Sequence, residues 1–403
     1  MRVLKKYDIS IHCILASLYF LMLPLTISVN SAGASFLKLA TIPIGMFFLV
    51  SLFFYKKDLH INIVHIMLAA YTVITVFTMF VCPTNTNFEN ILGYFLNAAL
   101  FICISVIEYN EKELKIFEYV QIALLIIITA ITFYNDTTVF DRATLSIFGQ
   151  TSDPNYYVGF FIFPLTVVMK KICESKHRIF YIIIAFCSLY AIFLSGSRGG
   201  LLAILVTIAA FAVIYPKKAI NKLFVMICMF LAVLLFWFAV RPFLPEQIID
   251  RMSIKAVIET GGTNRVYIWE SMMREIFDSP KDFIFGRGLE NLHRMIISGK
   301  EVMVYAHNHL VQVMYGQGVV GVISFLMLVS CCIFRCIGKR KCVAVALFGM
   351  LALSVSLSFN PSLKSFWNII PYAAFAFSDM QVGNIKNSTM SDDADVQGGN
   401  DKT

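Results

Sequence analysis

Long apolar runs recur along almost the whole chain, and they constrain the fold more than any other feature. They fall at residues 9–29, 36–55, 61–82, 91–107, 116–135, 156–169, 178–195, 199–215, 222–240, 308–334, 342–359 and 366–379. A helix that spans a bilayer needs about 20 apolar residues. Charged residues make up only 14% of the 403 residues, against roughly 25% in soluble proteins. The sequence therefore predicts an all-α polytopic membrane protein with about 12 transmembrane helices.

Basic residues collect on one side of these expected spans. The N-terminus, alternate connections and the tail hold 20 Lys and Arg residues, whereas the short connections on the other side hold four. By the positive-inside rule, both termini are cytoplasmic and residues 241–306 form a long extracytoplasmic loop with two or three short helices. We expect about nine helices in residues 1–240, about three in residues 307–379, and a disordered cytoplasmic tail over residues 380–403.

The cysteines and the N-terminus allow more than one interpretation. The 10 cysteines form no extracellular disulfide framework, because nearly all lie in apolar runs or beside basic connections. Cys331, Cys332 and Cys336 suit a metal or acylation site, or simply small apolar residues near an interface. The basic start before the first apolar run fits a cleavable signal peptide or, given the length of the run, an uncleaved anchor. The net charge of +8 follows from topology, and no nucleic-acid partner is expected.

Ionisable residues are rare inside the expected spans. Such residues are costly in a bilayer and mark ion or proton pathways. His65 and Glu118 have no obvious partner in the sequence, and a proton-coupled transporter would carry more such groups. The unusual polar residues gather instead at three places on the predicted outer face.

The first place is the connection Ser195-Gly196-Ser197-Arg198-Gly199-Gly200. Its glycines allow a tight turn and a close approach to the backbone. Because a helix begins here on the predicted outer face, its free N–H groups and Arg198 could together bind an anion. The alternative is an arginine that anchors a helix end at the membrane interface.

The second place is residues 261–270 in the long loop. Thr263 or Asn264 can cap a helix that has Arg265 in its first turn and Trp269 one turn later on the same face. A guanidinium binds phosphate in a fork, and an indole can lie against a sugar ring. The alternative is a solvated helix on which the arginine and the indole pack together.

The third place is residues 307–321, where the chain returns to the membrane. We expect His307 in the first turn of a helix, where the dipole favours the neutral imidazole that a general base needs. His309 would point elsewhere. Zinc between the two histidines lacks the spacing or cysteines that would support it, so no metal is expected.

These three places resemble the O-antigen ligase and Wzy-type O-antigen polymerase family. Over roughly residues 150–325 the chain has a span ending in SGSRGG, a long loop with an Arg followed by a Trp, and a spaced pattern that begins with His307 and Asn308. The family's ligase pattern leaves nine free positions after the Asn before a Gly, and then has Gly, Thr or Tyr three positions later. Gly318 and Gly321 meet it without a gap. Residues 152–155 resemble a polar stretch of the family more loosely.

The resemblance implies a metal-independent glycosyltransferase without a cofactor, in the bacterial inner membrane. Its partners would be an undecaprenyl-diphosphate-linked glycan donor, a glycan acceptor, membrane lipid, and a chain-length regulator and flippase. Arg198 and Arg265 would hold the diphosphate leaving group, and His307 would take the proton of the attacking hydroxyl. Five further residues would bind the substrate, the first four of them by orienting the sugar: Asp153, Asn155, Trp269, Arg287 and Asn308.

Several functions stay open at this point. The favoured one is polymerisation of lipid-linked repeat units into an O-antigen, capsule or exopolysaccharide, with the active site outside the cytoplasm. The ligase pattern also fits transfer of the glycan to a lipid A core or another surface acceptor. A transporter of lipid-linked sugars would be expected to show inverted repeats with broken helices, which are not evident. A non-catalytic component of an envelope complex is the remaining alternative.

Overall fold

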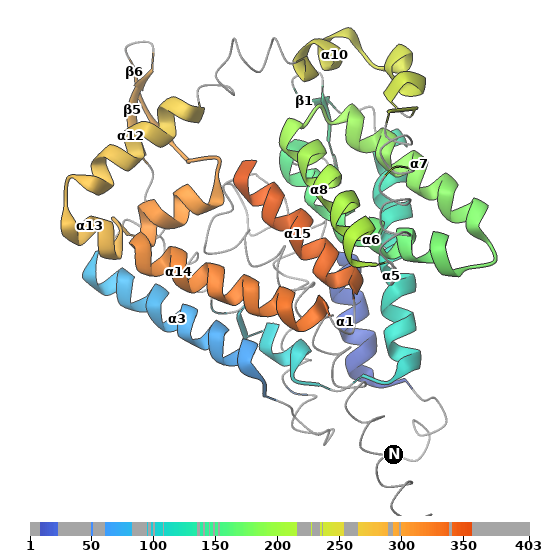
Figure 1. The fold of residues 1–403 in the computed structure, drawn as a ribbon, viewed down its shortest axis with the longest axis horizontal. Helices are drawn as coiled ribbons and strands as arrows, with labels where there is room; N and C mark the ends of the chain where they lie inside the picture. The colour runs from blue at the N-terminus through green and yellow to red at the C-terminus, as the bar shows by residue number, and fades with distance from the viewer. Residues whose placement is uncertain are drawn as a thin grey trace, which may run out of the picture.

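The computed structural model describes a mainly helical chain (Figure 1). The described stretches are 9–22, 61–82, 101–107, 109–134, 154–215, 237–253, 265–288, 293–297, 300–337 and 341–356, with shorter pieces at 50, 95, 98–99, 138–139, 142–144, 146–147, 150–151, 227 and 234–235. The expected span at 366–379 and the tail from residue 380 lie outside these residues, and of the expected span at 36–55 only residue 50 is described.

Eight apolar helices form the bundle within the described stretches: α1 (Ile11–Met22), α3 (Ile63–Val81), α5 (Glu111–Tyr134), α6 (Pro154–Glu174), α7 (Arg178–Leu194), α8 (Arg198–Ile214), α14 (His309–Ile337) and α15 (Lys341–Ser356). Among them α3, α5, α6 and α14 are long and apolar enough to cross a membrane. The helical membrane protein expected from the sequence is confirmed, and the count of 12 spans stays a prediction.

Helix α6 lies at the centre of the bundle and packs against α5, α7, α8 and α15. It was expected as a short span over 156–169, but it runs for 21 residues. Lys170 and Lys171 extend it because both ammonium groups pair with Glu118 of α5. Glu118 therefore has two partners that its position in the sequence did not reveal. His65 is also paired, with Ser105 Oγ 2.8 Å from its Nε2.

Several short helices and strands lie at the end of the bundle where α8 begins (Figure 1). We call this end of the bundle the loop end. It carries η3 (Arg241–Phe243), α10 (Glu246–Met252), α12 (Arg265–Phe277), α13 (Pro280–Phe285), β5 (His293–Ile297) and β6 (Lys300–Val304). Between α5 and α6 it carries two short antiparallel pairs, β1 (Thr138–Val139) with β2 (Arg142–Ala143) and β3 (Ser146–Ile147) with β4 (Gln150–Thr151).

The long loop was expected to contain two or three short helices, and the structure adds a β-hairpin in its second half. Strands β5 and β6 pair in antiparallel register from His293 opposite Val304 to Ile297 opposite Lys300. Both strands include β-branched residues, which favour a pleated surface. The two residues between them in the sequence, Ser298 and Gly299, are of turn-forming type.

Helix α14 is kinked at Gly318, and the backbone after α13 docks into the kink. Gly318 has φ +64°, and a Cβ there would lie 2.3 Å from the carbonyl oxygen of Ile284. The N–H of Arg287 donates to Tyr315 O at 2.8 Å, and that of Gly288 donates to Gly316 O at 3.0 Å. The first glycine of the ligase pattern therefore lets α13 and the segment after it pack against α14.

We expect Gly318→Ala to destabilise the protein, because a Cβ adds backbone strain and collides with the backbone at the end of α13. The loss should be at least about 2 kcal/mol and appear as a lower melting temperature in detergent. Ile323→Ala is the matched control on the same helix, since Ile323 is 54% exposed. Equal melting temperatures for the two variants would contradict the docking role of Gly318.

Candidate functional site

The connection between α7 and α8 is a buried, tightly hydrogen-bonded turn. Gly196 has φ +55°, and its N–H donates to Phe193 O at 2.9 Å. Ser197 caps α8, because its hydroxyl accepts from the N–H of Gly200 at 3.1 Å. Arg198 is the first residue of α8 and is partly exposed. As expected, the start of α8 and a guanidinium lie together at the loop end.

Arg142 supports this turn from one side. Its side chain is only 7% exposed. Its Nε donates to Ser195 O at 2.7 Å, and its Nη2 donates to Asn155 Oδ1 at 2.9 Å. Asn155 Oδ1 also accepts from the hydroxyl of Ser197 at 2.9 Å. The amide of Asn155 therefore joins Arg142 to the cap of α8. Through these two hydrogen bonds Asn155 stabilises the turn.

Arg251 of α10 lies against the turn from another side. Its Nε donates to Gly196 O at 3.2 Å, while its own carbonyl accepts from Arg198 Nε at 2.7 Å. A Cβ on Gly196 would lie 3.6 Å from Arg142 and 3.7 Å from Arg251. Burial, and then the positive charge of Arg251, lower the pKa of Arg198 from its usual value. Three guanidinium groups thus surround the glycine of the turn.

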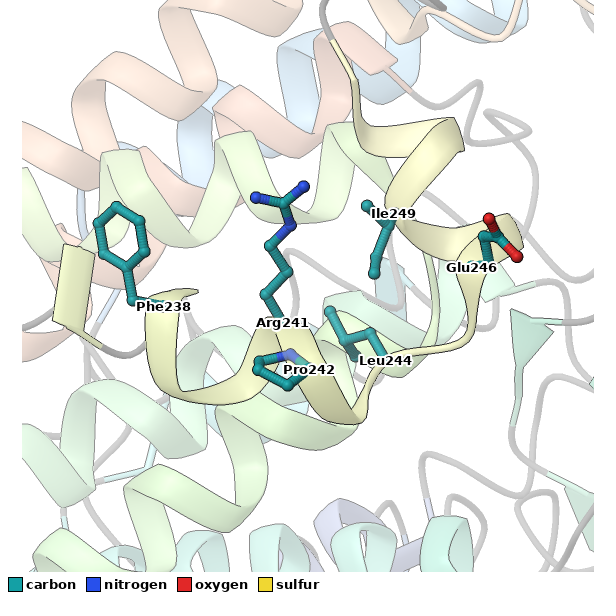
Figure 2. Close-up of a pocket in the computed structure, with 6 residues that line it drawn as sticks. All are labelled: Phe238, Arg241, Pro242, Leu244, Glu246 and Ile249. Carbon is teal, nitrogen blue, oxygen red and sulfur yellow. The ribbon is translucent and has the colours of Figure 1, made fainter.

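An open groove of about 440 Å³ lies beside this cluster, between η3 and α10 (Figure 2). Its walls are mostly apolar, and Figure 2 shows the side chain of Arg241 rising between Phe238 and Ile249. Leu244 and Ile249 also pack with Phe193 of α7. The η3–α10 segment, residues 241–252, is therefore anchored on the turn by apolar contacts as well as by Arg251.

The second group of predicted residues lies around α12 and the start of α14. Helix α12 begins at Arg265, as expected, and Arg265 is partly exposed. Four residues later, the indole Nε1 of Trp269 donates to Ala306 O at 2.6 Å. Trp269 therefore holds the residue that directly precedes His307.

His307 does not lie in the first turn of a helix, contrary to our expectation. Helix α14 begins at His309, and Asn308 caps it by accepting from the N–H of Leu310 at 3.0 Å. His307 precedes this cap with φ +50° and is exposed. His309 points elsewhere, as expected: it is 1% exposed, and its ring meets that of Phe325 edge-on at 4.7 Å.

Glu275 of α12 links the hairpin, the segment after α13 and α14. Its carboxylate accepts from the hydroxyl of Tyr315 at 2.9 Å and from Arg287. Its other oxygen lies 3.5 Å from Nδ1 of His293, whose Nε2 lies 2.8 Å from Ser271 Oγ. Arg287 was predicted to orient the sugar, but its guanidinium is engaged in this network.

The predicted residues thus fall into two groups at the loop end. Asn155 and Arg198 lie in the group around the α7–α8 turn, and Arg265, Trp269, Arg287, His307 and Asn308 lie on α12, after α13 and before α14. Asp153 lies outside the described residues. Figure 1 shows α10 over α8, and α12 with the hairpin over α14.

Sequence reasoning missed Arg142, Arg251 and Glu275. A faint signal existed for Arg142, which is one of only four basic residues on the sparse side of the charge count. Arg251 and Glu275 had none, because their partners lie far away along the chain, 55 residues for Arg251 and Gly196. No group of three or more metal-ligating side chains occurs within the part of the chain that the structure describes.

A comparison with protein families finds one match that overlaps the two groups of residues. The family model described as O-antigen ligase matches residues 183–326. Residues 183–326 are therefore similar to an O-antigen ligase domain. This region runs from α7 into α14 and contains Arg198, Arg265 and His307, whereas Arg142 and Asn155 lie before it. The resemblance found in the sequence is confirmed, and the family indicates a glycosyl-transfer enzyme of the O-antigen ligase and polymerase type.

Two other comparisons, with curated proteins and with solved structures, do not extend the family match. No curated protein matches the chain. A chain in the solved structure reported as "Structural coordination of polymerization and crosslinking by a peptidoglycan synthase complex" is 13% identical with a TM-score of 0.47, covering 80% of this chain and 97% of that one. A similarity of this size carries no argument about fold or activity.

Within the matched region, we expect Glu275→Gln to loosen the hairpin, because the neutral amide cannot satisfy Arg287, Tyr315 and His293 together. Lost hydrogen bonds to a charged group should cost roughly 1–3 kcal/mol. Hydrogen exchange across residues 293–304 should accelerate.

Glu270→Gln is the matched control on the same helix. Glu270 is 55% exposed and pairs only with the exposed Arg274 in the described residues, and such surface pairs contribute about 0–1 kcal/mol. Unchanged hairpin exchange in Glu275→Gln would contradict the linking role of Glu275.

Proposed function

We propose that the protein polymerises undecaprenyl-diphosphate-linked oligosaccharide repeat units into a surface polysaccharide. The observation that carries the proposal is a region similar to an O-antigen ligase domain that has a partly exposed guanidinium and an exposed imidazole at its loop end. The transfer would need a cation for the leaving diphosphate and a base for the acceptor hydroxyl. Arg198 and His307 have the chemistry for these two tasks.

The chemical step balances with these groups alone. His307 takes the proton from an acceptor hydroxyl, and the oxygen attacks the anomeric carbon of the donor sugar. The bond between that carbon and the diphosphate breaks, and the electron pair leaves with the diphosphate while the configuration at carbon inverts. Arg198 and Arg265 stabilise the growing negative charge, so that the protein needs no metal for this step.

The remaining predicted residues take supporting parts in this proposal. Trp269 and Asn308 fix the backbone on either side of His307 through Ala306 O and the start of α14. Asn155 stabilises the α7–α8 turn. Arg287 pairs with Glu275 and so stabilises the contact between α12 and the segment after α13. Asp153 keeps its expected role in orienting sugar.

The loop end would face the outside of a bacterial inner membrane, with both termini in the cytoplasm. This orientation follows from the 20 basic residues on one side of the spans against four on the other. Donor, acceptor and product would then meet on the outer face. A flippase would have to deliver the donor, and a chain-length regulator would act on the product.

A ligase reaction is the second candidate, because the matched family is described as O-antigen ligase. Deletion of the gene separates the two reactions by the glycolipid that accumulates. A polymerase deletion should leave single repeat units on undecaprenyl diphosphate, whereas a ligase deletion should leave long chains that are not transferred. A lipid-linked unit confined to the inner leaflet would instead support a transporter.

We expect His307→Ala to abolish long-chain glycan while the protein stays in the membrane at a normal level. The loss of a positioned general base should slow transfer by about 10²- to 10⁴-fold, which gel analysis of the glycan would show. His177→Ala is the control, because His177 is exposed and precedes α7 at the end opposite the loop end. A normal chain-length distribution in the His307 variant would remove this residue from the mechanism.

We also expect transfer by the purified protein to continue in EDTA, because arginine side chains take the place of a metal beside the diphosphate. The measurement is glycan formation from a lipid-linked donor with and without the chelator. Loss of activity in EDTA with recovery on added magnesium or zinc would overturn the metal-free step.

A further inference from the structure

Arg198 and Arg251 lie together, and no carboxylate among the described residues neutralises them. The Nε of each side chain donates to a backbone carbonyl. Arg198 donates to Arg251 O, and Arg251 donates to Gly196 O. In the described residues, no carboxylate pairs with either side chain and no acceptor takes their terminal Nη groups. Two fixed, adjacent positive charges repel each other, and a bound anion would remove that repulsion.

The backbone carbonyls orient the two side chains in advance. A guanidinium held by its Nε keeps its Nη groups for a ligand, and guanidinium forks match phosphate oxygens well. The N-terminus of α8 begins at Arg198 and adds positive potential at the same place. Two guanidinium groups beside one helix start suit a diphosphate better than a single phosphate.

Arg142 plays a different part in this cluster. It is buried, and its Nε and Nη2 donate to Ser195 O and Asn155 Oδ1. Its charge adds to the positive field around Gly196, but these nitrogen atoms hold the turn. Arg142 is therefore a positioning residue.

We propose that Arg251 binds the diphosphate of the lipid-linked donor together with Arg198. This inference rests on the proposed function and deepens it. The sequence analysis named Arg198 and Arg265 as the arginines that hold the diphosphate, and it did not include Arg251. Arg251 comes from a seven-residue helix that packs on the α7–α8 turn, so the η3–α10 segment becomes part of the donor site.

The test is direct binding of farnesyl diphosphate and farnesyl monophosphate to the full chain purified in detergent. The wild-type protein should prefer the diphosphate. Arg251→Ala should weaken diphosphate binding roughly 10- to 100-fold, the effect of losing hydrogen bonds to a charged group. It should weaken monophosphate binding less, so that the preference falls. The diphosphate affinity of Arg251→Lys should lie between those of the wild type and Arg251→Ala, because lysine keeps the positive charge but lacks the two-pronged guanidinium.

Arg241→Ala is the matched control. Arg241 is an exposed arginine on the same η3–α10 segment and lines the adjoining groove, so it tests whether any lost cation has the same effect. We expect binding by this variant to stay within twofold of the wild type. Melting temperatures of all variants show whether the turn has kept its structure. A structural role alone would lower both affinities equally and leave the diphosphate preference unchanged, and that result would overturn the proposal.

Two outcomes separate this inference from the proposed function. If Arg198→Ala loses the diphosphate and Arg251→Ala keeps it, Arg251 is not a ligand, and the proposed glycosyl transfer stands. If the wild-type protein binds the diphosphate no better than the monophosphate, both the two-arginine site and the proposed donor chemistry are contradicted.

Discussion

The crowding of positive charge around one glycine is the constraint on which the account of this site depends. The three-residue turn between two apolar helices holds Gly196 at φ +55°, a conformation that residues with a Cβ rarely adopt, and the side chains of Arg142 and Arg251 lie within contact distance of this glycine. Arg142 is fixed from within the bundle and Arg251 from the loop. The start of α8 adds its own positive potential. In the described residues, the turn brings cations together without acids, an arrangement that favours an anionic ligand.

The imidazole is held by a second set of contacts that reaches it through backbone. Trp269 holds Ala306 and Asn308 caps α14, so His307 stands between two fixed neighbours in a left-handed conformation. For a residue other than glycine this conformation costs of order 1–3 kcal/mol, and the surrounding hydrogen bonds offset that cost. The kink at Gly318 and the carboxylate of Glu275 then secure α12, the hairpin and α14 to one another. Rigid support of this kind is what a positioned base requires.

The sequence predicted those parts of the structure that depend on neighbouring residues. Apolar runs bounded by charges located α3, α7 and α8 within about two residues, and the start of α12 at Arg265 followed from its capping signal. The hairpin was missed although Ser298 and Gly299 were a usable turn signal. His307 lies before α14 and not inside it because Asn308, a residue type that favours the cap position, caps the helix.

The contacts that define the two groups could not be read from the sequence. Arg142 meets Ser195 across 53 residues, and Arg251 meets Gly196 across 55. Hydropathy and spacing carry no information about such pairs. Arg287 and Glu275 are closer, 12 residues apart, but helix α13 lies between them and sets their geometry. Long-range pairing therefore decides which charged residues are ligands and which are supports.

The central claim is that the arginine turn and His307 serve one site on the outer face of the membrane. Its most direct test is labelling of a His307→Cys variant in intact cells with a membrane-impermeant maleimide, located by mass spectrometry. The native Cys173 is exposed at the opposite end of the bundle and reports leakage. Our account predicts that position 307 reacts in intact cells, that Cys173 reacts only after lysis, and that undecaprenyl diphosphate slows the reaction at 307 unless Arg198 is also replaced by Ala. Reaction at 307 only after lysis, or protection that persists without Arg198, would contradict it.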